Sequence, residues 1–107
     1  MTSLEFEKHV DYCRIRIEST LMKKTREYRR GNNPFHNFDR AAKITGESSA
    51  KALKGMWMKH LVSIFDIIDD AESGKLPTED QLAEKISDSI NYQILLEGLI
   101  IRQIRGE

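Results

Sequence analysis

Two long apolar stretches, each carrying a narrow line of polar side chains, constrain the fold of this chain most. Residues 52–70 read ALKGMWMKHLVSIFDIIDD, and residues 84–104 read EKISDSINYQILLEGLIIRQI. Steps of three and four residues bring side chains onto one face of a helix. Polar side chains follow this spacing on both stretches: Lys59, Ser63, Asp66 and Asp70 on the first, and Glu84, Asp88 and Asn91, with Leu95, on the second. We therefore expect two long apolar helices, each with a polar seam.

Asp66 is the residue of these two seams that most needs a partner, because it lies inside the apolar run LVSIFDII. A carboxylate that leaves water is costly unless it is paired, hydrogen-bonded or bound to a metal ion. One interpretation is that the two seams face each other and form an acidic, cation-binding site. The alternative, which the seams alone leave open, is that Asp66 bonds to Ser or Lys neighbours or lies at the edge of the buried face.

Size and composition limit the classes of protein that remain. The 107 residues indicate a single domain, residues 1–107, and so short a chain buries little surface alone, which favours a partner subunit. The 17 basic and 17 acidic residues balance, so we expect no nucleic-acid polymer as partner. The one cysteine, Cys13, and the missing signal peptide favour the cytoplasm. Asp66 and Glu97 interrupt the longest apolar runs, so we expect no membrane span.

The order of apolar periods, caps and breakers predicts an all-α fold of three long helices and one short one. We expect helices at residues 3–29, 39–44, 50–72 and 79–105, with capping boxes at Thr2 and Thr78. Six residues form the predicted core side of the last helix: Ile86, Ile90, Ile94, Leu95, Leu99 and Ile100. Its remaining apolar residues widen this surface, so we expect a helical bundle completed by oligomerisation, as a homodimer or homotetramer.

The segment GNNPFHN, residues 31–37, separates the first two helices and is unusual for a surface loop. Phe35 and Phe38 flank His36 and Asn37, which places aromatic faces beside hydrogen-bonding groups. Such a loop could stack on a nucleobase and contact it. The ordinary alternative is that the two phenylalanines pin the loop to the core while His36 stays at the surface.

Several reaction classes have no support in the sequence. There is no glycine-rich phosphate loop, nucleophile elbow, HExxH motif or cysteine pair. Carboxylates on helices remain, and their hard oxygens suit Mg²⁺, with Mn²⁺ as an alternative. These ions neutralise phosphate charge and activate water, which suits cleavage of a phosphoanhydride.

Four blocks of the sequence together resemble a known family. In chain order they are KTREY, NPFHNF, ALKGMWMKHLVSIFD and EKISDSINYQILLEGLI, and the resemblance covers roughly residues 21–99. This order is similar to that of the MazG-like all-α nucleoside triphosphate pyrophosphohydrolases, and most of all to a compact, often phage-encoded branch associated with nucleotide modification. The resemblance implies a Mg²⁺-dependent enzyme that converts an NTP or dNTP to the monophosphate and pyrophosphate, in the host cytoplasm if the chain is phage-encoded.

The resemblance also implies roles for individual residues. Asp66, Glu84 and Asp88 would hold the metal ion, and Glu27 would add a ligand or position water. The predicted substrate-binding residues are Lys24, Asn37, Phe38, Lys59, His60, Asn91 and Tyr92. In the family the earlier helix carries an ExxE pair, whereas this chain has Lys59, His60 and Ser63 there. This departure motivates an alternative function, in which the protein binds or sequesters a nucleotide or nucleotide signal without cleaving it.

Overall fold

The computed structural model describes residues 1–28 and 30–107, without the side chains of Thr25 and Tyr28. It consists of four helices in this order: α1 Ser3–Tyr28, α2 His36–Thr45, α3 Ser49–Glu72 and α4 Glu79–Ile104. The predicted all-α class is confirmed, with three long helices and one short one. The predicted end of the first helix, at residue 29, lies outside the described residues. No helix in the described part of the chain has an apolar length sufficient to cross a membrane.

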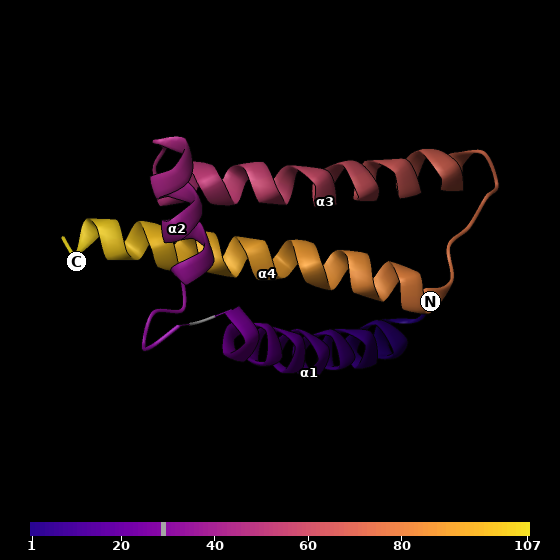
Figure 1. Cartoon of the computed structure of the whole chain (residues 1–107). Helices are drawn as coiled ribbons and strands as arrows, with labels where there is room; N and C mark the ends of the chain where they lie inside the picture. Colours follow the sequence, from indigo (N-terminus) through magenta and orange to yellow (C-terminus); the bar gives the residue numbers. More distant parts are fainter. Residues whose placement is uncertain (29) are drawn as a thin grey trace.

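The three long helices lie side by side in one open layer. The helix α4 runs in the middle, between α1 and α3, and the short α2 crosses the layer near the C-terminal end of α4 (Figure 1). The chain reverses between α3 and α4, so these two helices are antiparallel. Each outer helix therefore has one long neighbour, and large parts of its surface face away from the rest of the chain.

Local hydrogen bonds explain where the helices begin. At the start of α1, the Thr2 and Glu5 side chains each accept a hydrogen bond from the other's backbone N–H, at 3.1 and 3.0 Å. Thr78 and Gln81 form the same reciprocal capping box at α4. The Ser48 hydroxyl accepts from the backbone N–H of Lys51 at the start of α3. These caps place three helix starts within one residue of the predicted positions.

The short helix α2 begins at His36, three residues before the predicted start at Asp39. The first residue of the turn, Asn33, accepts a hydrogen bond from the Phe35 backbone N–H and donates one to the Asp39 carboxylate. Asn33 thus orders the chain just before the helix. Because Asn33 lies outside the helix, the helical pattern of the sequence did not predict this role. As predicted, α2 ends at Gly46, whose φ of 73° suits a left-handed cap.

The buried core is small and lies where α2 crosses the layer. In the described part of the chain the buried apolar residues are Phe38, Ala42, Ala52, Leu53 and Leu99. The predicted core side of α4 was wrong at Ile94 and Ile100, which are 42% and 39% exposed. The buried positions of α4 include Ser87, Ser89 and Asn91 instead. The reason is that α4 is covered on its two flanks, by α1 and α3, whereas the isoleucine-rich stripe lies between those flanks.

Polar and aromatic contacts fasten the loop and α2 to the end of α4. The Asp39 carboxylate accepts two hydrogen bonds from the Arg102 guanidinium, at 2.7 and 3.0 Å. It also accepts one from Ser49, at the start of α3. These hydrogen bonds, chiefly those from Arg102, hold the pKa of Asp39 well below its usual range. The Phe35 ring packs directly on Gly98, where any side chain would collide with it.

Candidate functional site

A pocket of about 360 Å³ lies between α1, α3, α4 and the loop before α2. This volume is in the range of sites that bind small molecules. All seven predicted substrate-binding residues line the pocket: Lys24, Asn37, Phe38, Lys59, His60, Asn91 and Tyr92. The remaining lining residues are Asp88, Leu21, Pro34, Met56 and Leu95. The structure thus places the seven residues of the predicted substrate site around one pocket, together with five further residues.

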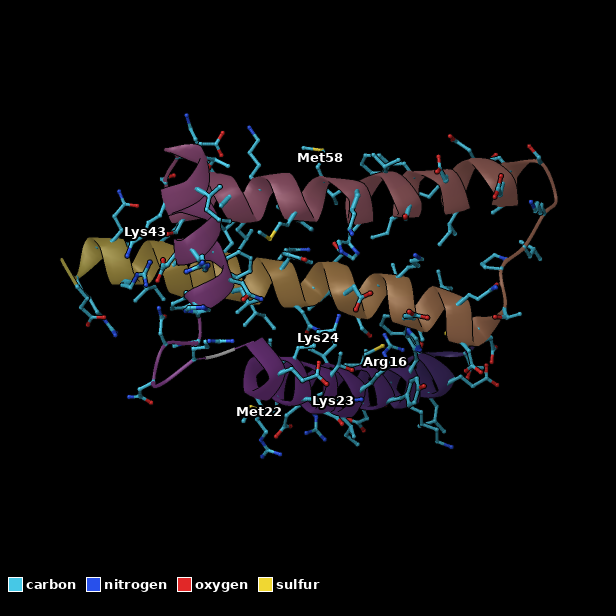
Figure 2. The ribbon with its side chains drawn as sticks, viewed as in Figure 1. Arg16, Met22, Lys23, Lys24, Lys43 and Met58 are labelled. Atoms are coloured by element: carbon cyan, nitrogen blue, oxygen red, sulfur yellow. The ribbon has the colours of Figure 1, made fainter. Side chains whose placement is uncertain are left out.

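An ion pair between two helices forms one polar wall of the pocket. The Lys24 ammonium of α1 donates a hydrogen bond to the Asp88 carboxylate of α4, at 2.7 Å between Nζ and Oδ1. Lys24 extends toward α4, whereas its neighbours Met22 and Lys23 point to the outer side of α1 (Figure 2). The two side chains are 33% and 15% exposed, so the pair lies partly inside the protein. Lys24 therefore brings its positive charge into the pocket.

Asn91 is the least satisfied polar residue of the site. It is 2% exposed, yet neither Nδ2 nor Oδ1 of its amide has a hydrogen-bond partner among the described residues. Burying an amide without partners costs about 1–3 kcal/mol, so such groups are uncommon in folded proteins. The two neighbouring serines of α4 are satisfied, since Ser87 accepts from Arg16 and Ser89 accepts from Trp57. The Asn91 amide therefore provides a buried donor and a buried acceptor at the pocket wall, neither of which a described residue satisfies.

Three rings form the aromatic side of the pocket. The Tyr92 ring lies 5.0 Å from the His60 ring, centroid to centroid, and 6.4 Å from the Phe38 ring. Phe38 meets Tyr92 edge-on, at an interplanar angle of 65°. Phe38 is also 7% exposed and belongs to the core. Phe38 therefore pins the loop to the core, as the second interpretation of this loop predicted, and it also lines the pocket.

His60 is kept neutral by its surroundings. Burial lowers the pKa of His60 below its usual value, and the positive charges of Lys59 and Lys24 lower it further. One interaction acts in the opposite direction, because the negative charge of the Asp88 carboxylate raises the pKa of His60. The net shift of this pKa is downward. At neutral pH the imidazole is thus an uncharged ring with one donor and one acceptor nitrogen.

The three predicted metal ligands do not come together in the pocket as the predicted substrate-binding residues do. Asp88 lines the pocket, but Asp66 and Glu84 are exposed and lie outside it. Among the described residues, no three His, Cys, Asp or Glu side chains are close enough together to hold a metal ion. Because the Asp88 carboxylate is also paired with Lys24, this donor set does not fit a divalent cation within the single chain. Mg²⁺, with Mn²⁺ as the alternative, stays a prediction.

Glu27, the fourth predicted catalytic residue, lies on a different surface. It is exposed and borders a shallow hollow on the outer side of α1. The other residues of this hollow are Ser19, Met22, Lys23 and Arg26. Glu27 follows Lys24 by three residues and is offset from it by about 60° around α1. The offset is toward Lys23, which borders the same hollow as Glu27. Its predicted role as a ligand or water-positioning group stays a prediction.

Sequence reasoning missed three of the lining residues: Leu21, Pro34 and Met56. Leu21 precedes Lys24 by one helical turn, so its place beside Lys24 follows from helical spacing. Met56 precedes Lys59 and His60 by the same kind of step. Pro34 had no comparable signal, because its position depends on how the loop folds back over the helices.

The fold and the site together define a small all-α protein with a partly cationic, partly aromatic pocket. A comparison of the chain with protein-family models, with curated proteins and with solved structures found no match. The resemblance to MazG-like enzymes therefore rests on the four short sequence blocks and stays a prediction. What the pocket can bind has to be inferred from its own residues.

Proposed function

We propose that the protein binds a nucleotide, or a small molecule built from nucleotides, in the pocket beside Asn91. The observation that carries this proposal is the buried amide of Asn91, whose donor and acceptor both lack a partner among the described residues. A ligand that satisfies both atoms recovers the cost of burying them. In this proposal the base meets Asn91 and the rings, and the phosphates meet the lysines.

The chemistry of Asn91 fits a nucleobase. Every base has an edge on which a hydrogen-bond donor and an acceptor lie side by side, and an Asn amide can pair with such an edge through two bonds. A base stacked on Tyr92 would join the group of rings that His60 and Phe38 form around Tyr92. Stacking of a base on an aromatic side chain contributes about 1–3 kcal/mol. Asn91 and Tyr92 are adjacent in the sequence, so one turn of α4 would present both contacts.

The charge of the pocket fits a phosphate. Lys24 and Lys59 line it, and Asp88 is the one carboxylate among the lining residues. With His60 neutral, the lining residues carry a net charge of about +1. An ammonium on a flexible stem suits a phosphate group as a compact point charge. The pocket thus favours an anion over a free metal ion.

A second candidate function is the pyrophosphohydrolase activity that the sequence blocks imply. One observation favours it, namely that the Asp88 carboxylate borders the same pocket as the proposed base and phosphate contacts. Both candidates require nucleotide binding, but only this one requires that the bound molecule be cleaved.

Binding and cleavage can be separated in one experiment. We expect calorimetry in EDTA to detect binding of at least one nucleotide from a panel of mono-, di- and triphosphates and cyclic dinucleotides, and weaker binding of ribose 5-phosphate and pyrophosphate. Mass spectrometry of each ligand after long incubation, with and without Mg²⁺, then tests cleavage. An unchanged mass supports the binding protein. Conversion to the monophosphate and pyrophosphate supports the second candidate, and no binding by any nucleotide overturns both.

Adjacent lysines provide a matched control for the phosphate contact. Lys24→Gln removes the charge that extends into the pocket, whereas Lys23→Gln removes one from the outer side of α1 (Figure 2). Loss of a charge-assisted contact is expected to weaken affinity about tenfold. Equal affinities of the two variants would contradict a role for Lys24 in phosphate binding.

Nucleotide binding should strengthen as the pH falls. Burial and the neighbouring lysines lower the pKa of His60 in the free protein, and a phosphate nearby would raise it, because an anion favours the imidazolium. Binding would then take up a proton, so affinity rises as the pH falls through the pKa of the bound state and levels off below the pKa of the free state. Each unit of difference between these pKa values is worth a factor of about ten.

Calorimetry at pH 8, 7 and 6 measures this dependence. The phosphate itself titrates near pH 6, so the His60→Gln variant is the control for the ligand's own protonation. The proposal expects the slope of affinity against pH to decrease in His60→Gln. An identical slope in both proteins would exclude His60 as the coupled group.

A further inference from the structure

A second hydrogen-bonding side chain lies next to Asn91 in the pocket. Asp88 and Asn91 are three residues apart on α4, and both line the pocket. Helical residues at this spacing have Cβ atoms about 5–6 Å apart, so one base can reach both side chains. Lys24 bonds to Oδ1 of Asp88, but a carboxylate has about four lone-pair sites and can accept from a ligand as well. The pocket wall thus offers a carboxylate acceptor beside an amide with one acceptor and one donor.

The surroundings of Asp88 indicate which end of a bound base it meets. In the proposed binding mode the phosphates meet the lysines, and the Lys24 ammonium is 2.7 Å from the Asp88 carboxylate. Burial increases in the same direction, because the side chains of Lys24 and Asp88 are 33% and 15% exposed, whereas Asn91 is 2% exposed. The phosphate and sugar therefore lie toward Lys24 and Asp88, and the far end of the base lies toward Asn91.

Guanine is the base whose edge matches this order of groups. At the position nearest the sugar, guanine carries an amino group, which is a donor, whereas adenine has a C–H there and the pyrimidines have a carbonyl oxygen. The guanine edge continues with the N1–H donor and ends with the O6 acceptor. It therefore needs two acceptors followed by one donor. Asp88, then Oδ1 of Asn91, then Nδ2 of Asn91 supply these groups in that order.

We propose that the pocket selects a guanine nucleotide and that Asp88 is the residue that determines this specificity. The inference rests on the proposed nucleotide binding and adds the identity of the base. Neither polar atom of the Asn91 amide has a partner among the described residues, so the ligand sets which of them faces Asp88. The opposite orientation would suit an edge with the order donor, acceptor, donor, which no common base has. Adenine and the pyrimidines would leave the Asp88 carboxylate facing a group that is not a donor.

Calorimetry in EDTA with different bases tests the proposal on the wild-type protein. Guanosine, inosine and adenosine nucleotides are compared at the number of phosphates that binds best. Inosine lacks only the amino group and should bind about tenfold more weakly than guanosine, and adenosine about 100-fold more weakly. Adenosine or inosine binding as tightly as guanosine would overturn the base assignment while leaving nucleotide binding in place. No binding by any of the three would overturn the proposed function itself.

Asp88→Asn provides a test that a purely structural role of Asp88 would not pass. The amide oxygen can keep the contact with Lys24, while the new Nδ2 donor opposes the guanine amino group and matches xanthine, which has a carbonyl oxygen at that position. The wild type should prefer guanosine over xanthosine nucleotides by about tenfold or more, and the variant should reverse this order. Equal weakening of both ligands would contradict a role in base selection.

The matched control is Asp69→Asn on α3, an exposed residue outside the pocket. It should keep the wild-type order of guanosine and xanthosine nucleotides, and a reversal there would contradict the assignment to Asp88. Circular dichroism establishes that each variant is folded. If Asp88→Asn does not fold, the comparison of guanosine with inosine on the wild type decides the proposal, because it removes the same hydrogen bond from the ligand side.

Discussion

Asn91→Leu is expected to weaken nucleotide binding by a factor of about 10 to 100 while raising the free energy of unfolding of the ligand-free protein by about 1 kcal/mol. Leu has the same branching as Asn but no polar atoms, and its larger methyl groups can extend into the pocket that Asn91 lines. The substitution removes a buried amide whose two polar atoms lack partners among the described residues. Stability and binding should therefore change in opposite directions, as expected of a residue retained for a ligand.

Chemical unfolding and calorimetry on the same samples measure the two effects. Loss of a two-bond contact to a base costs about 1–3 kcal/mol, a factor of about 10 to 100 in affinity. Gln93→Leu, two residues further along α4 and exposed outside the pocket, is the control and should leave both quantities nearly unchanged. A large loss of stability in Asn91→Leu would instead mean that the amide holds the fold together.

Asp39→Asn is expected to lower the free energy of unfolding by about 2 kcal/mol at pH 7. The carboxylate accepts two hydrogen bonds from Arg102 and others from Ser49 and Asn33, so it connects the loop, α3 and α4. Asp39 and Arg102 are 25% and 29% exposed, which places the value below that of a fully buried ion pair. The neutral amide keeps the shape of the side chain but loses the charge.

The ion pair of Asp39 and Arg102 should also make the stability of the fold depend on pH in acid. Because the pKa of Asp39 is lower in the folded protein than in the unfolded chain, its contribution is complete above the unfolded value of about 4 and is lost as the pH falls toward the folded value. The difference in unfolding free energy between wild type and Asp39→Asn should be constant from pH 8 to 5 and should shrink below about pH 4.

Urea unfolding at pH 7, 5 and 3 follows this difference. Asp11→Asn is the control, because Asp11 pairs with Arg14 at 4.0 Å on an exposed face of α1 and contributes little. Equal effects of the two substitutions at pH 7 would contradict the role of Asp39 as the residue that connects three segments.

The helix starts were predictable because their causes are local. Thr2, Thr78 and Ser48 cap their helices through residues only three positions away, so the necessary information lies within a few residues of the sequence. The start of α2 was not predictable in this way, since Asn33 orders the turn through Asp39 six residues later. Asp39 is itself held by Arg102, which is distant in the sequence.

The sequence by itself determined which residues share a helical face, because the helical period depends on nothing else. It grouped Asp88 with Asn91 and placed Lys59 beside His60, and all four line the pocket. Only the tertiary structure decided which faces are covered. It put Asn91 in contact with the pocket, left Asp66 and Glu84 exposed, and turned Ile94 and Ile100 of α4 outward. The physical reason is that burial depends on how helices far apart in the sequence pack together, and no local pattern records that packing.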